Sequence, residues 1–253
     1  MSPKASQRSR TDDSEMSFWD HLEVLRGTIL RSVIAVALAS VVFLAFPHRL
    51  FSFVLWPSTA DFPFYRWTGL DFSMDLINIE VSAQFFVHLK IALLSGIVVA
   101  FPYIIYELWR FIRPALYEKE RKSASRAFGM SSFLFYLGAA VGYFIVLPVC
   151  LVFFMNYTVS DVINNTIALN SYISLFISMV FMIGLLFEFP TVVMVLSGIG
   201  LLKRADLKAA RKYAFVIVLL LAALITPSDP VSMFVLGIPL YGLYEFSILV
   251  CRK

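Results

Sequence analysis

Six apolar stretches alternate with polar segments along the 253-residue chain, near 28–46, 86–106, 127–153, 172–202, 213–225 and 231–250. Most approach or exceed the roughly 20 residues that a helix needs to cross a bilayer core about 30 Å thick. The pattern therefore predicts an all-α integral membrane protein with six transmembrane helices. We assign residues 16–253 to this single membrane domain and expect the polar residues 1–15 to form a disordered tail.

The last two stretches are shorter than the others. The fifth offers about 20 Å of helix between Lys212 and Thr226, and the uncharged run of the sixth offers about 21 Å between Pro230 and Glu245. Because both fall short of the bilayer core, we expect the lipid around this half of the molecule to be thinned, or the flanking charges to snorkel.

Composition and charge indicate how the chain is oriented. The chain is 60% hydrophobic and 15% charged, which is more apolar than a water-soluble domain of this length can bury. Its formal net charge is +4, but 18 of its 21 Lys and Arg residues lie before or just inside the first stretch, after the second and fourth stretches, or at the C-terminus. Only Arg49, Arg66 and Lys90 lie elsewhere. The positive-inside bias therefore predicts that both termini are cytoplasmic.

Two segments beside the spans predict further helices. Ser17 can cap a helix, and Phe18, Leu22, Leu25 and Ile29 then recur at helical spacing. We expect a short amphipathic helix along the cytoplasmic surface; the alternative is an extension of the first span. The longest external connection, 47–84, is rich in aromatic residues and proline, and predicts short interfacial helices that cap the outer face.

Small residues and cysteines add two expectations. Gly138 and Gly142 are spaced four apart in the third stretch, which permits close contact with a neighbouring helix. Cys150 and Cys251 fall at opposite membrane faces, so we expect no disulfide bond between them.

An acidic residue, Glu188, lies in the middle of the fourth stretch. A carboxylate in hydrocarbon is costly unless it is neutral, paired or facing water. We therefore expect a protonated carboxyl that donates a hydrogen bond; the alternative is a purely structural contact with a polar neighbour such as Ser178. Pro190, two residues on, removes a backbone donor and predicts a kink at this point.

The connection at 107–121 keeps three carboxylates on a face that is otherwise strongly basic. Glu107, Glu118 and Glu120 lie beside aromatic residues in this segment. Carboxylates accept paired hydrogen bonds from arginine, and aromatic rings attract its guanidinium, so the segment suits a cationic, partly apolar peptide. The alternative is a set of salt bridges within the loop.

The sequence contains no enzyme signature. Its three histidines, His21, His48 and His88, are scattered over both faces without metal-ligand spacing, and there is no nucleophile elbow or phosphate-binding loop. We therefore predict no catalytic site, no metal and no cofactor. Energy for work must then come from an ion gradient or another subunit.

Seven stretches form a specific combination: 21–26, 102–107, 109–121, 138–144 leading to Pro148, 187–190, 226–229 and 239–245. In these stretches the chain resembles the TatC family, the polytopic core subunits of the twin-arginine protein translocase. The resemblance runs from about Phe18 to Lys253.

The resemblance implies a glove-shaped six-helix bundle with a concave face and no cofactor. Its cytoplasmic face would bind the twin-arginine signal peptides of folded precursor proteins. TatB-like and TatA-like single-span partners would dock against the membrane-embedded surface. Transport would use the proton-motive force, in a self-associating receptor complex of the bacterial inner membrane and without nucleic acid.

The resemblance also implies roles for individual residues. Glu188 becomes a polar contact inside the concave face, and the partner-docking side includes Pro57, Thr226, Asp229 and Met233. The signal-peptide-binding residues are Glu23, Arg26, Phe111, Pro114, Leu116, Tyr117, Glu118, Glu120 and Arg121.

Three positions depart from the family pattern. Val24 stands where the family usually has Glu, so that acidic role passes to Glu23 or is lost. Ser228 replaces a proline, and Met233 replaces a glutamine whose hydrogen bonds it cannot make.

Two other classes of protein are compatible with parts of the pattern. A proton-coupled small-solute transporter would also use an intramembrane acid, but it predicts internal repeats with broken helices, and no convincing repeat is present. An intramembrane protease needs a nucleophile with a base in register, which the motifs do not provide.

Overall fold

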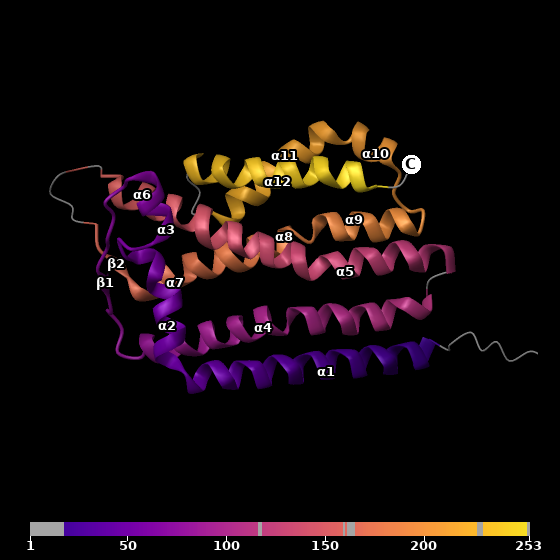
Figure 1. The fold of residues 1–253 in the computed structure, drawn as a ribbon, viewed down its shortest axis with the longest axis horizontal. Helices are drawn as coiled ribbons and strands as arrows, with labels where there is room; N and C mark the ends of the chain where they lie inside the picture. The colour runs from indigo at the N-terminus through magenta and orange to yellow at the C-terminus, as the bar shows by residue number, and fades with distance from the viewer. Residues whose placement is uncertain (1–17, 116–117, 159, 161–164, 227–229, 252–253) are drawn as a thin grey trace, which may run out of the picture.

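The computed structural model describes residues 18–115, 118–158, 160, 165–226 and 230–251. The predicted disordered tail, 1–15, lies outside these residues. The described chain forms an elongated bundle whose long helices run side by side along the longest axis (Figure 1).

Six passes along this axis make up the body of the bundle. The first two passes are α1 (Phe18–Ala45) and α4 (Ala83–Ile112). The third joins α5 (Glu118–Val141), the π-helical turn η3 (Gly142–Val146) and α6 (Leu147–Asn156). The fourth joins α7 (Leu169–Ile177), the π-helical turn η4 (Ser178–Met182), α8 (Ile183–Leu186) and α9 (Phe189–Gly198). The last two are α11 (Arg211–Ile225) and α12 (Pro230–Val250), with the short α10 (Arg204–Ala209) before them.

The lengths and directions of these passes agree with the predicted class. Five of them are long and apolar enough to cross a membrane, and the all-α prediction is confirmed. α11 is the short pass, with 15 residues, whereas α12 continues through Glu245 to 21 residues. The beginning of α1, the connections from α4 to α5 and from α9 to α10, and the end of α12 all lie at one end of the bundle (Figure 1). We call it the basic end, because most of the Lys and Arg residues that the structure describes lie in or next to these segments.

The first helix corrects one prediction. α1 is a single helix of 28 residues from Phe18 to Ala45, and it is straight in Figure 1. The described residues before Thr28, 18–27, therefore extend the first span and form no separate helix. The local capping pattern at Ser17 could not exclude this extension, because the same apolar spacing continues into the span.

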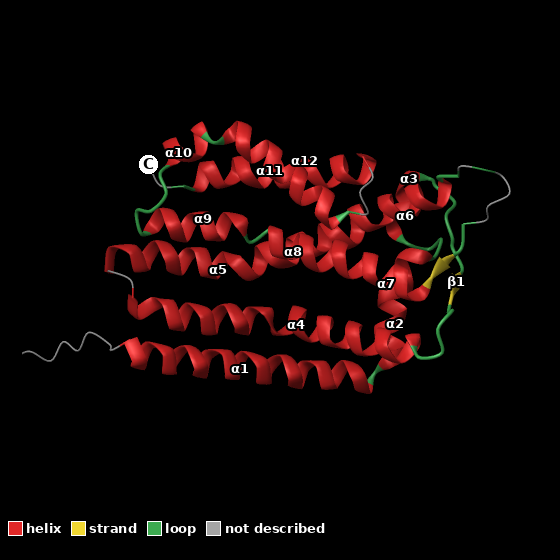
Figure 2. Ribbon diagram, turned by 180° about the vertical axis from the view of Figure 1, so that it is seen from behind, coloured by secondary structure: helices red, strands yellow, loops and turns green. Residues whose placement is uncertain are grey.

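The opposite end is covered by the predicted cap. It consists of α2 (Pro47–Leu55), the 3-10 turn η1 (Trp56–Ser58) and α3 (Pro63–Thr68). Two short strands that the sequence did not predict, β1 (Leu76–Ile77) and β2 (Ile167–Ala168), pair in parallel beside it (Figure 2).

Two buried tyrosines of the bundle attach this cap, and a third lies within the cap itself. The hydroxyls of Tyr143 and Tyr172 donate hydrogen bonds to the carbonyl oxygens of Phe53 at 2.7 Å and Val54 at 2.6 Å. These carbonyls lie in the last turn of α2, and that of Phe53 also accepts from the backbone N–H of Trp56. Tyr65 in turn donates to the carbonyl of Pro57 at 2.7 Å. The cap is therefore held by the bundle and not only by its own packing.

Both cysteines are buried thiols, Cys150 in α6 and Cys251 after α12. They lie in segments at opposite ends of the bundle (Figure 1). This arrangement agrees with the expectation that they form no disulfide bond with each other.

Close helix contact is made at the predicted glycine pair. A methyl group at Gly138 would collide with the ring of Phe187, and one at Gly142 with the backbone carbonyl of Met179. The third pass thus meets the fourth at distances that only glycine permits. A similar contact joins the first two passes, where Gly96 of α4 lies against Ser40 of α1.

Replacing Gly142 with alanine should therefore destabilise the protein. The added methyl group must displace backbone, and we expect a loss of about 1–3 kcal/mol of folding free energy, the usual cost of overpacking. Gly129→Ala in α5 is the matched control, since no atom lies within 4 Å of the new methyl group. The control should be neutral or stabilising, because alanine has the higher helix propensity. Melting curves in detergent measure both variants; equal stability for the two would contradict the close contact.

Candidate functional site

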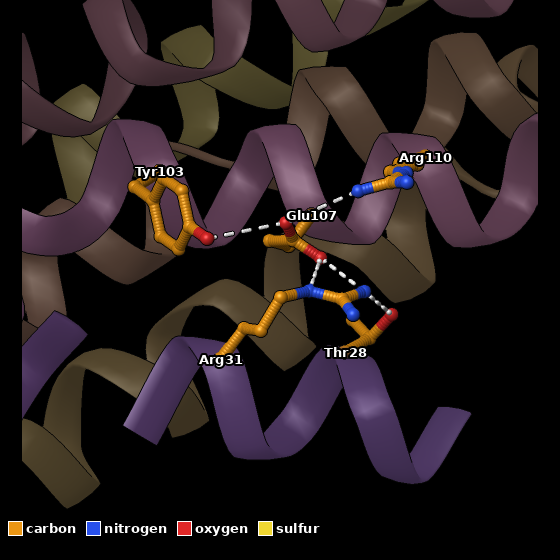
Figure 3. Close-up of polar contacts among 5 residues, drawn as sticks. All are labelled: Thr28, Arg31, Tyr103, Glu107 and Arg110. Carbon is orange, nitrogen blue, oxygen red and sulfur yellow. Dashed lines mark hydrogen bonds and ion pairs between the residues drawn. The ribbon is translucent and has the colours of Figure 1, made fainter. Parts of the chain in front are cut away.

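An ion pair between a buried Glu107 and a half-exposed Arg31 joins α1 to α4 near the basic end. The side chain of Glu107 is 2% exposed, and its Oε2 accepts from Arg31 Nη2 at 2.7 Å and Nε at 2.8 Å. Its other oxygen accepts from the Tyr103 hydroxyl at 3.2 Å, and Arg110 Nη1 lies 4.0 Å away. Thr28 accepts a further hydrogen bond from Arg31 at 3.4 Å (Figure 3).

This network already occupies the carboxylate of Glu107. A buried charge is stabilised only when paired and hydrogen-bonded, and both oxygens of Glu107 have donors within the chain. Of the three carboxylates expected to suit a cationic peptide, that of Glu107 is therefore already engaged within the chain. The alternative of a salt bridge applies to Glu107, whose nearer partner, Arg31, lies on α1 and whose more distant partner, Arg110, lies in the same segment.

The predicted signal-peptide-binding residues belong to three elements that meet at the basic end (Figure 1). Glu23 and Arg26 are exposed on the first turns of α1. Phe111 is partly buried at the end of α4, and Pro114 is exposed in the 3-10 turn η2 (Arg113–Ala115). Arg121 is partly buried in α5.

The other predicted signal-peptide-binding residues are described only in part or not at all. Leu116 and Tyr117 lie outside the described residues. Glu118 and Glu120 belong to the first turn of α5, but their side chains are outside the described part of the structure. The backbone thus places these two residues between η2 and Arg121.

Glu188 lies where the fourth pass is broken. α8 ends at Leu186 and α9 begins at Phe189, with Pro190 in the first turn of α9, so the predicted kink is present. The proline has no N–H to continue the helical hydrogen bonds across this point. Glu188 is 9% exposed and faces α5.

The hydrogen-bond partner of Glu188 is Ser131, and not Ser178 as proposed above. Ser131 Oγ lies 2.5 Å from Oε2 of Glu188. Ser178 lies ten residues earlier in the same pass, about 15 Å away along a helix, which is beyond the reach of the side chain. Oε1 of Glu188 and the hydroxyl of Thr191 are both buried without a well-formed hydrogen bond in the described residues.

The predicted partner-docking residues lie toward the capped end. Pro57 is buried in η1, and Thr226 is buried after α11, where its hydroxyl donates to the Ala222 carbonyl at 2.9 Å. Met233 is partly buried in the first turn of α12, and Asp229 lies outside the described residues. The structure thus brings Thr226 and Met233 to adjoining helix ends.

Sequence reasoning missed the polar partners of the charged side chains on the long helices. Besides Arg31 and Ser131, these include Glu245 of α12, whose Oε2 lies 2.7 Å from Nη2 of Arg211 at the start of α11. The sequence feature that could have indicated these partners is a charge inside a span, because such a charge requires a polar partner at the same depth on a neighbouring helix. Within the described residues, no three His, Cys, Asp or Glu side chains gather to hold a metal ion.

Comparisons with known proteins place the whole arrangement in one family. The sequence model of "Sec-independent protein translocase protein (TatC)" matches residues 20–239. The TatC protein of Blattabacterium sp. subsp. Periplaneta americana is 34% identical over 257 residues, covering 95% of this chain and 97% of that protein. The TatC protein of Aquifex aeolicus is 33% identical over 234 residues, covering 92% of this chain and 93% of that protein.

A solved structure agrees with the fold as well. The crystal structure of a twin arginine translocase receptor, TatC, superposes with a TM-score of 0.77 at 32% sequence identity, over 92% of this chain and 100% of that one. The family consists of protein-translocase components, so the prediction that the chain is not an enzyme is confirmed. The chain is a multi-pass membrane protein that belongs to the TatC family and takes part in Sec-independent protein translocation.

Proposed function

We propose that this chain is the receptor subunit of a twin-arginine translocase, and that its basic end binds the signal peptides of folded precursors. The observation that carries the proposal is the meeting of α1, α4 and α5 at one end, with Glu23, Phe111 and the Glu118–Glu120 turn on neighbouring elements. A translocase of this family must recognise its cargo before transport, and this is the end that gathers carboxylates and aromatic residues together.

The basic residues around the proposed site repel a cationic peptide, and the site must overcome this repulsion. Arg26, Arg113 and Arg121 repel a twin-arginine peptide, so binding needs a local reversal of sign. Since Glu107 is engaged by Arg31, the reversal falls to Glu23, Glu118 and Glu120. An exposed ion pair contributes only about 0.2–1 kcal/mol, which is too little for recognition. Apolar groups must therefore exclude water around the contact; the candidates are Phe111, Leu116 and Tyr117.

The proposed orientation follows from the same charges. The basic end faces the cytoplasm of a bacterium, and the α2–α3 cap faces outward from the inner membrane. Both termini are then cytoplasmic, and a precursor meets its receptor on the side where it is made.

The proposed partners are TatB-like and TatA-like single-span proteins. They dock on the side of Pro57, Thr226, Asp229 and Met233, in a self-associating complex that uses the proton-motive force. Glu188 contributes a polar contact within this assembly.

Variants of Glu188 separate the possible roles of this carboxyl. If it acts as a neutral hydrogen-bonding group, Glu188→Gln should retain most export, since the amide oxygen can still accept from Ser131 Oγ. Glu188→Ala should reduce the recovery of copurifying single-span partners, and Ser131→Ala should cost about 1–3 kcal/mol of stability, because it leaves a buried acceptor without its partner. If Glu188→Gln exports as little as Glu188→Ala, the carboxyl shuttles protons. If both variants export fully and assemble with partners, Glu188 has no part in partner contact.

Peptide binding tests the receptor proposal. Glu120→Ala should lower the affinity for a twin-arginine signal peptide more than for its twin-lysine analogue, because only arginine loses a bidentate contact. Binding to the whole protein in inside-out vesicles measures both affinities, and a double-mutant cycle over peptide and protein gives the coupling. Right-side-out vesicles should bind neither peptide.

The matched control is Glu80→Ala, which removes an exposed carboxylate near the opposite end, just before α4. It should leave both affinities unchanged. An equal loss for the two peptides in Glu120→Ala would show that Glu120 acts only through general charge. Binding confined to right-side-out vesicles would reverse the proposed orientation.

A further inference from the structure

An apolar groove lies at the capped half of the bundle, between α1, α2, α4 and the α7–η4 region. Its volume is about 390 Å³, within the range of roughly 300–1,000 Å³ that ligand pockets occupy. The buried side chains that line it are Leu50, Val54, Leu94 and Phe176, and the exposed ones are Val42, Phe46, Phe53 and Val99.

One cation lines this groove. Arg49 is exposed in the first turn of α2, and within the described residues it has no ion-pair partner. The two other basic residues away from the basic end differ from it. Lys90 donates a hydrogen bond to Asn170 at 3.4 Å, and Arg66 lies in α3 and is not part of the groove. Arg49 therefore adds an unneutralised charge to an otherwise apolar surface.

The depth of the groove matches one leaflet of a bilayer. α2 crosses the ends of α1 and α4 in Figure 1, whereas Val98 and Val99 lie at the middle of α4. The lining thus extends from the helix ends to about the midplane, roughly half of a hydrocarbon core about 30 Å thick. A molecule that fits has an anionic group at the level of α2 and an apolar chain directed toward the midplane.

We propose that this groove binds a phospholipid of the leaflet on the α2 side. Its phosphate is held by the guanidinium of Arg49, whose planar donors match phosphate oxygens in pairs. One acyl chain lies along Leu94, Val98 and Phe176, between α1 and the fourth pass. An apolar helix of a partner would leave the Arg49 charge without an anion, so the lipid is the better match.

Native mass spectrometry of the full chain, titrated in detergent with palmitoyl-oleoyl-phosphatidylglycerol, tests this site. The wild type should retain one tightly bound lipid per chain. Arg49→Gln should weaken that binding about tenfold, as expected for losing one charge-assisted hydrogen bond. Arg66→Gln is the matched control and should stay within about twofold of wild type. Glycerol phosphate, which carries the headgroup without the chains, should not displace the lipid.

A second variant tests the apolar part of the site. Ser95→Phe narrows the groove from α4 and should also lower lipid retention, and a melting curve shows whether it remains folded. If Ser95→Phe does not fold, the comparison of Arg49→Gln with Arg66→Gln decides the question alone. Equal affinity in Arg49→Gln and Arg66→Gln would overturn the proposal. Displacement of the lipid by glycerol phosphate would also overturn the proposal, because the groove would then bind a free anion. A dimer that dissociates in Arg49→Gln would overturn it too, because the groove would then hold a second copy of the chain.

Discussion

The ion pair between Arg31 and Glu107 fixes the one long helix that has little else to hold it. Only 11% of the apolar window of α1 is buried, so most of this helix faces outward. Its close contacts are with α4, through Ser40 against Gly96 in one half and through Arg31 and Glu107 in the other. Because α1 is straight and continuous, these two contacts also fix its first turns, which carry Glu23 and Arg26.

The same constraint recurs at Glu188, which interrupts the fourth pass and receives Ser131 from α5. An unpaired charge inside the apolar bundle would be costly, so this contact also specifies which helices are neighbours. Arg211 and Glu245 form a further ion pair between the last two helices, but it is exposed and contributes little to stability. Glycine makes the approach of the third and fourth passes possible, since Gly138 admits Phe187, the neighbour of Glu188, and Gly142 admits Met179 further along. Packing and polar pairing therefore position the faces that the proposed function uses.

The sequence predicts the elements of this fold better than it predicts their contacts. Hydrophobic length and the placement of basic residues anticipated the bundle and its basic end, and Pro190 anticipated the break at Glu188, because these are local properties of the chain. The partner of Glu188 was sought nearby at Ser178, whereas Ser131 is 57 residues away. Arg31 and Glu107 are 76 residues apart, and β1 pairs with a strand about 90 residues later. Such contacts depend on the relative depth of helices, which a periodic pattern does not encode.

The Arg31–Glu107 pair sets the position of the first turns of α1 beside α4. Double electron–electron resonance between spin labels at Leu22 and Arg113 measures this directly, in nanodiscs and with both native cysteines replaced by alanine. The distance distribution should be narrow in the otherwise native protein and clearly broader in Arg31→Gln. Arg211→Gln, which breaks the ion pair between α11 and α12, should leave the distribution narrow. An unchanged distribution in Arg31→Gln would contradict the account.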